Sequence, residues 1–278
     1  MAVDLAAARA AEADSEASAA VISAAAERTA IGSGIARGGY NLDQLLSDLV
    51  QRLKTAFGEQ LISVILYGSA AVGDWQQKKS DLNVLCVLDR ITPAELAKSE
   101  PVFRWWREKR QPAPLLLTTE EVRASTDCFA MEFHDMQQHR RVLHGNDVIL
   151  GLTVEDRFYR AQVEHELRGK QIRLRQKAAE LLPDHKRLVT LLTDSISTFC
   201  VLGRHALVLS GREARWKKQE ILAALEGLLG IPFKNCTTIL AIRQSGESLS
   251  SGDAVSLLDG YLKETDALVR FVDGLAIP

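Results

Sequence analysis

The stretch LYGSAAVGDWQQKKSDLNVLCVL, residues 66–88, starts at the end of one apolar run, passes a glycine-serine pair and Asp81, and ends in a second apolar run. The first run, LISVILY, is short, almost entirely apolar and ended by Gly68, so it predicts a buried β-strand. The second, LNVLCVLD, follows Ser80 and Asp81 and predicts another strand. A glycine after a buried strand lets the backbone approach a phosphate group, and Ser69 can offer a hydroxyl and an amide to its oxygens. A helix starting behind this turn would add its positive N-terminal end.

Asp81 and Asn83 are the candidate metal ligands of this stretch. Residues two apart on a strand point to the same side, so their side chains would face one point in space. Two carboxylates there would hold Mg²⁺ ions ~3.5–4 Å apart, one for a triphosphate and one to activate an attacking hydroxyl. Asn83 instead supplies a neutral amide oxygen, which can ligate Mg²⁺ but adds no negative charge. The pattern therefore predicts an atypical, weakened metal site.

Predicted helices and strands alternate around this stretch. Residues 41–57 place leucines at helical spacing after an asparagine that can cap the helix. Capping boxes at Thr92–Glu95 and Thr118–Glu121 predict two further helix starts, and the apolar run APLLLT before the second box predicts a third strand. Pro101 is expected to end or restart the helix that begins at Pro93. This alternation predicts an α/β domain over residues 40–152.

The two ends of the chain differ from this central part. Residues 1–39 are rich in alanine with few bulky apolar side chains, and we expect a flexible N-terminal tail. After about residue 153 the strand signals end. Proline and glycine then separate helical patterns over residues 155–182, 185–210, 213–229, 233–243 and 251–275. The sequence therefore predicts an all-α helical bundle over residues 153–278, whose first helix interleaves cations and acids as on a salt-bridged, solvated face.

The bulk composition excludes several classes of protein. The 278 residues are 46% hydrophobic and 25% charged, which are ordinary globular values. A formal net charge of −2 provides no general attraction to nucleic acid or to an anionic membrane. The four cysteines form no CxxC pair and mostly lie in apolar surroundings, which indicates free thiols in a reducing compartment. Because the sequence has neither a clean apolar run of ~18 residues nor a signal-peptide start, we expect a cytoplasmic protein without a membrane partner.

The order of apolar strand, Gly68-Ser69, an interval with room for a short helix, and Ser80-Asp81-x-Asn83 on a second strand resembles the nucleotidyltransferase superfamily. This group includes polymerase beta-like enzymes and aminoglycoside nucleotidyltransferases, and many members carry a helical partner domain. The resemblance covers about residues 41–145. It implies an α/β (α+β) domain with a small mixed sheet, an NTP and Mg²⁺ as ligands, and a hydroxyl acceptor. It also implies that Gly68, Ser69 and Ser80 hold the nucleotide and that Asp81 and Asn83 are the catalytic metal ligands.

The sequence departs from the family pattern at two places. Asn83 stands where the pattern has a second carboxylate. The strand predicted within residues 113–119, APLLLTT, contains no acidic residue where the pattern has a third. Glu132 or Asp135, further along the chain, could approach the site, but spacing alone does not establish this.

Three hypotheses follow. The first is the NTP-dependent transfer of a nucleoside monophosphate to a hydroxyl acceptor, with Glu132 as an additional helper. The second is a catalytically inactive nucleotide-binding sensor or interaction module on the same fold. The third is a ribonuclease built on the bundle, because Arg160 and His165 form an Arg-x4-His spacing. The sequence does not identify the acceptor, the preferred base or the oligomeric state.

Overall fold

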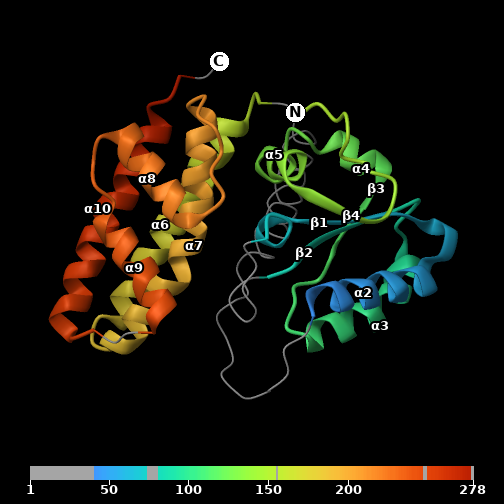
Figure 1. The fold of residues 1–278 in the computed structure, drawn as a ribbon, viewed down its shortest axis with the longest axis horizontal. Helices are drawn as coiled ribbons and strands as arrows, with labels where there is room; N and C mark the ends of the chain where they lie inside the picture. Colours follow the sequence, from blue (N-terminus) through green and yellow to red (C-terminus); the bar gives the residue numbers. More distant parts are fainter. Residues whose placement is uncertain (1–40, 74–80, 155, 247–248, 277–278) are drawn as a thin grey trace, which may run out of the picture. The chain divides into compact units, whose positions relative to one another are not determined.

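The computed structural model describes residues 41–73, 81–154, 156–246 and 249–276, which divide into two compact units, 41–154 and 156–276. The first unit is built around a mixed four-stranded sheet, and in the described part of the second every regular element is a helix (Figure 1). The predicted fold class, an α/β domain with a small mixed sheet followed by a helical bundle, is confirmed.

The sheet has the strand order β3-β2-β1-β4. Its strands are β1 (Leu61–Tyr67), β2 (Asn83–Leu88), β3 (Leu115–Thr118) and β4 (Arg140–Gly145). β1 runs antiparallel to both of its neighbours, whereas β2 and β3 are parallel. The pairing sets Tyr67, the last residue of β1, opposite Asn83 on one side and Arg140 on the other. The end of β1 is therefore where residues from three strands meet.

The two faces of the sheet bury separate apolar cores. On one face, helices α2 (Leu42–Phe57) and α3 (Pro93–Glu108) cover Leu66 and Val84. On the other face, α4 (Thr119–Ala124) and α5 (Ala130–Gln138) cover Ile65 and Leu85 (Figure 1). Successive strand residues face opposite sides, so from Val64 to Tyr67 and through β2 the even-numbered residues face α2 and α3 and the odd-numbered ones face α4 and α5. The irregular register at the start of β1 reverses this order, because Leu61 lies in the core under α2 and α3 and Ile62 packs against the other core. Two short 3₁₀ helices, Gly58–Gln60 and Gly68–Ala70, flank β1.

Helix α3 continues through Pro101, so the prediction that the helix ends or restarts there is wrong. Both capping boxes form as predicted, and that of Thr92 and Glu95 opens this helix. Proline removes one backbone hydrogen bond and costs ~3 kcal/mol or more inside a helix. Pro101 and Ala97, whose carbonyl loses its partner, are exposed and can be hydrated. Trp106 is fully buried beyond the proline, and its burial favours one continuous helix.

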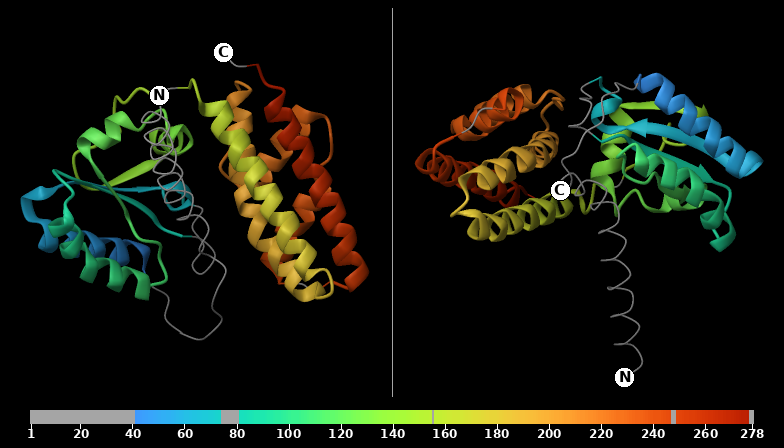
Figure 2. Two further views of the ribbon diagram at one scale, coloured as in Figure 1. Left: turned by 180° about the vertical axis from the view of Figure 1, so that it is seen from behind. Right: turned by 90° about the horizontal axis from the view of Figure 1, so that it is seen from below.

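The second unit consists of α6 (Tyr159–Leu181), α7 (His185–Leu209), α8 (Lys218–Leu229), α9 (Lys234–Ser245) and α10 (Ser251–Asp273). α7 packs against the other four, and α6, α7 and α10 run alongside one another (Figure 2). Helix α8 begins later than predicted, because residues 212–216 form no regular structure and Lys217 before the helix is extended. In this segment the ring centroid of Trp216 lies 4.0 Å from the Arg204 guanidinium carbon of α7. None of the described helices combines the length and the apolarity needed to cross a membrane.

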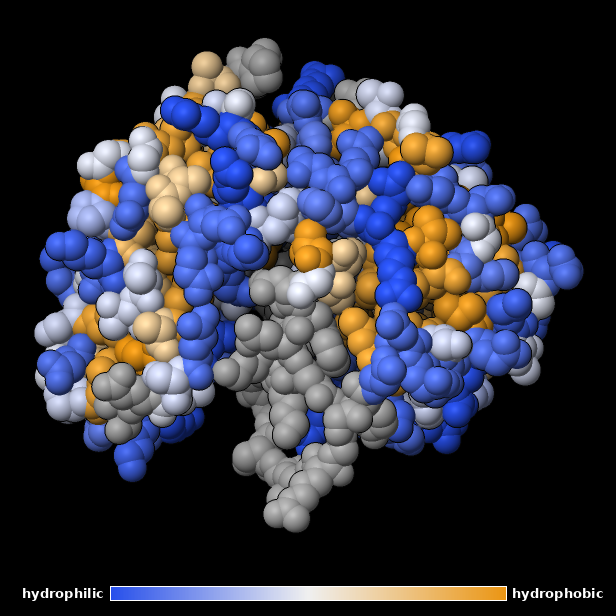
Figure 3. All heavy atoms as spheres, viewed as in Figure 1, coloured by the Kyte–Doolittle hydropathy of each residue, from blue (hydrophilic) through white to orange (hydrophobic). Residues whose placement is uncertain are grey.

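On the face of this unit that Figure 3 shows, hydrophilic side chains predominate and smaller hydrophobic areas lie between them. On α6, Glu164 pairs with Arg160 at 2.8 Å and with Arg168 at 2.7 Å. Arg168 also reaches Asp273 of α10 at 3.0 Å. The predicted salt-bridged face of the first bundle helix is confirmed. All four cysteines of the chain are free, and three of them are buried.

Candidate functional site

The turn after β1 depends on Gly68 for two reasons. Its φ of +74° is a backbone conformation that residues with a side chain rarely adopt. A Cβ at this position would also lie 2.8 Å from Nδ2 of Asn83, so the Asn83 side chain packs directly against the glycine. Residues 68 and 83, which the sequence predicts to act together, are thus in contact.

The sequence predicts a short helix in the interval between the two strands. Residues 74–80 of this interval lie outside the described residues, and in its described part residues 68–73 form a three-residue 3₁₀ helix and a turn. This element includes the half-buried Ser69 and closes with a hydrogen bond from the Ala71 N–H to the Gly68 carbonyl at 3.0 Å. One 3₁₀ turn is too short to develop the dipole of a helix N-terminus, so any phosphate contact here would depend on the local N–H and hydroxyl groups. Ser80, the third predicted nucleotide-binding residue, lies outside the described residues.

Asp81 and Asn83 flank Leu82, and the burial of Leu82 shows which face of the sheet Asn83 faces. Leu82 is buried in the core under α2 and α3, and its N–H donates to Oε1 of Gln111 at 2.9 Å. Asn83, the next residue and the first of β2, therefore faces the opposite side, towards α4 and α5. Asp81 precedes the strand by two residues and is half-buried. Both predicted metal ligands thus adjoin the Gly68 end of β2.

Two acidic residues of α5 lie near this end of the sheet. Tyr67 is on the same face as Asn83, its cross-strand partner, and packs with the core under α5. Burial raises the pKa of the Tyr67 hydroxyl, and the nearby carboxylates of Glu132 and Asp135 raise that pKa further. β3 carries no acidic residue. Acidic side chains therefore approach the end of β1 from a helix, whereas the family pattern has the third acid on a strand.

The donor atoms fit a Mg²⁺ ion that arrives with its nucleotide better than a resident metal ion. Within the described ranges, no three His, Cys, Asp or Glu side chains are grouped so that they could hold a metal. Mg²⁺, however, is commonly bound by one or two protein carboxylates together with the phosphates of a substrate. Asp81, with the amide oxygen of Asn83 as a weaker donor, can complete such a set.

The Arg-x4-His pair of α6 does not converge on a site. The Arg160 guanidinium donates to Glu164 and to the carbonyl of Val272 at 3.3 Å, so it ties α6 to the end of α10. His165 is exposed, and residues five apart lie about 140° around a helix from one another. The contacts of Arg160 account for its presence without a ribonuclease.

Comparison with known proteins supports the fold. No family profile matches the sequence, and no curated protein matches it significantly. Among solved structures, the chain is similar to spectinomycin adenyltransferase AAD(9) from Enterococcus faecialis, a crystal structure with ATP and spectinomycin. The TM-score is 0.53 at 13% sequence identity, and the match covers 83% of this chain and 99% of the adenyltransferase. At this identity the similarity shows a nucleotidyltransferase-like fold.

Proposed function

We propose that this chain binds a nucleoside triphosphate at the Gly68–Ser69 turn and transfers its nucleoside monophosphate to a hydroxyl acceptor. The observation that carries the proposal is the contact between Gly68 and Asn83 in a nucleotidyltransferase-like fold. At this contact, a turn that a phosphate can approach closely adjoins the start of β2, which Asp81 precedes by two residues. The acceptor oxygen attacks the α-phosphorus, the bond from that phosphorus to the bridging oxygen breaks, and pyrophosphate leaves.

Each residue of the site has a separate role in this proposal. Gly68 admits the phosphates to the backbone, and Ser69 donates from its hydroxyl and its N–H. Asp81 would hold Mg²⁺, with Asn83 as the weaker ligand, and a bound ion would offset the negative charge of the triphosphate. Glu132 is the candidate to accept the proton of the acceptor hydroxyl, because it lies on the face of the sheet that Asn83 also faces.

A second candidate function is a nucleotide-binding sensor or interaction module without turnover. Two observations favour it. Asn83 adds no charge at the second ligand position, and β3 has no carboxylate. Such a protein would keep the turn at Gly68 and bind an NTP, but it would not lower the barrier to phosphoryl transfer enough for measurable reaction.

Calorimetric titration with each of the four NTPs, with and without Mg²⁺, tests both candidates when it is combined with a pyrophosphate-release assay. The assay uses a panel of hydroxyl acceptors that includes sugars, amino-sugars and nucleosides. Mg²⁺-dependent pyrophosphate release supports the transferase. Binding of an NTP without release on any acceptor supports the module. If no NTP binds, both proposals are wrong.

Replacing Gly68 with alanine is expected to weaken ATP binding roughly tenfold or more, about 1.4 kcal/mol. The added Cβ would push the Asn83 side chain away from the turn. The matched control is Gly73→Ala, because Gly73 has a φ of +77° but no atom within 4 Å of an added Cβ. Both variants should lose about 1–2 kcal/mol of unfolding free energy from the strained φ. Urea unfolding and ATP titration measure the two effects, and equal loss of ATP affinity in both variants would contradict the role of the Gly68–Asn83 contact.

A further inference from the structure

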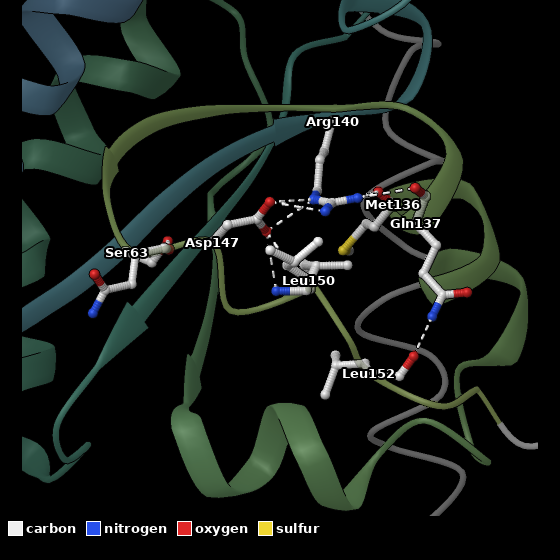
Figure 4. A network of polar contacts seen from close by, with 9 residues as sticks. Ser63, Met136, Gln137, Arg140, Asp147, Leu150 and Leu152 are labelled. Carbon is white, nitrogen blue, oxygen red and sulfur yellow. Dashed lines mark hydrogen bonds and ion pairs between the residues drawn. The ribbon is translucent and has the colours of Figure 1, made fainter.

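Arg140, the first residue of β4, joins the end of α5 to the loop after β4 (Figure 4). Its Nε donates to Oδ1 of Asp147 at 2.8 Å, and its Nη2 lies 2.8 Å from Oδ2 of the same carboxylate. Its Nη1 donates to the carbonyls of Met136 at 3.1 Å and Gln137 at 2.9 Å, in the last turn of α5. The Arg140 side chain is only 15% exposed, and charge-assisted, two-point pairs of this kind are the strong ones.

Further hydrogen bonds tie the same loop to both α5 and β1. The Gln137 side chain donates to the Leu152 carbonyl at 2.6 Å, and the Ser63 hydroxyl donates to the Asn146 carbonyl at 2.6 Å. The hydrogen bond from Arg140 lowers the pKa of Asp147, so this carboxyl group is charged at neutral pH. The end of α5 is therefore held to the strand that ends at the candidate nucleotide turn.

The position of α5 matters because of the two acids that it carries. A nine-residue helix is not stable alone, so packing and the contacts at its ends decide where it lies. Glu132 and Asp135 are three residues apart and share one side of this helix. Their helix packs through Phe133 and Met136 in the core that Tyr67 also contacts, and Tyr67 is the cross-strand partner of Arg140. A shift of α5 would therefore move both carboxylates relative to the end of β1, and fraying of its last turn would move Asp135.

We propose that Arg140 is a positioning residue that acts through Glu132 and Asp135, and this inference rests on the proposed nucleotide site. Held near the Gly68 turn, the two carboxylates repel a metal-free triphosphate and favour the same nucleotide when Mg²⁺ offsets its charge. Arg140 thereby increases the dependence of nucleotide binding on Mg²⁺. The quantity that reports this role is the dissociation constant for ATP in EDTA divided by that in Mg²⁺.

The test compares Arg140→Met with Arg141→Met. Arg141 is the next residue of β4 and pairs at 2.7 Å with Asp43 of α2, so its loss removes the same charge without touching α5. Arg140→Met is expected to lower the ratio of the two dissociation constants at least about threefold, as is Glu132→Gln. Arg141→Met should leave the ratio unchanged. Adding Arg140→Met to Glu132→Gln should lower the ratio by less than the sum of the separate effects, because Arg140 acts partly through Glu132.

Hydrogen exchange separates local loosening from unfolding. The amides of α5 should exchange faster in Arg140→Met than in Arg141→Met, while the amides of α2 and α3 stay protected. If Arg140→Met does not fold, Asp147→Asn replaces it, with the same fall in the ratio expected. If wild type shows Mg²⁺-dependent binding but Arg140→Met and Arg141→Met give equal ratios, the inference is wrong and the proposed function stands. Absence of ATP binding by wild type overturns both.

Discussion

Replacing Asp81 with alanine is expected to abolish the Mg²⁺-dependent part of nucleotide binding and with it any release of pyrophosphate. Asp81 is the carboxylate that adjoins β2 at the end beside Gly68, and its predicted partner Asn83 adds no negative charge. Mg²⁺ depends on ligand charge, so the amide oxygen alone should not retain the ion. We expect affinity for Mg²⁺-ATP to fall roughly 100-fold, about 2.7 kcal/mol, as measured by calorimetry.

Asp89 provides the matched control for this prediction. It follows the far end of β2, is exposed, and lies away from the Gly68 turn along the strand. Asp89→Ala should bind Mg²⁺-ATP like wild type. Metal-free binding should be equal in wild type and both variants, or slightly stronger in Asp81→Ala, because a repulsive charge has been removed. Wild-type affinity for Mg²⁺-ATP in Asp81→Ala would show that Asp81 is not a ligand of the metal.

Much of the first unit could be predicted from sequence because its signals are local. The capping boxes at Thr92 and Thr118 need only residues three apart in the chain, and both form. β1 and β2 are short apolar runs whose burial is evident from composition.

β4 could not be predicted in this way. Its sequence, RRVLHG, has two arginines and a histidine, and it is a strand because it pairs with β1. Helix α3 also continues through Pro101 because of tertiary packing, which buries Trp106 beyond the proline.

The candidate site likewise has a part that local sequence signals predict and a part that depends on tertiary packing. The spacing of Gly68 and Asn83 indicates that they meet, because two strands and a turn are enough to bring them together, and Asp81 lies two residues before Asn83. The approach of Glu132 and Asp135 depends on how α5 packs. Its buried Phe133 and Met136 and the contact between Arg140 and Asp147 contribute to that packing, and this contact is not visible in any local pattern. A search for the third acid along β3 therefore finds leucines, while acidic residues near Tyr67 come from a helix that the sequence leaves unplaced.

Replacing Asn83 with aspartate is expected to strengthen Mg²⁺-ATP binding about tenfold, which is ~1.4 kcal/mol, and to weaken binding without metal. The new carboxylate would join Asp81 as a second charged ligand, and in the absence of Mg²⁺ the two would repel each other and the triphosphate. The variant should therefore melt at a lower temperature than wild type in EDTA, and Mg²⁺ should recover part of the loss. Calorimetric titration and thermal melting in EDTA and in Mg²⁺ measure both effects.

Asn83→Ala separates the gain of charge from the loss of the amide that packs against Gly68. This control should weaken ATP binding in both conditions without changing the effect of Mg²⁺. If Asn83→Asp and Asn83→Ala respond to Mg²⁺ alike, residue 83 does not face the metal and serves only to pack against the turn. If Asn83→Asp binds Mg²⁺-ATP more tightly and also releases pyrophosphate faster than wild type, the natural protein is an enzyme attenuated at this residue. Tighter binding without release would instead favour the nucleotide-binding module, because the scaffold would then lack more than one carboxylate of a working site.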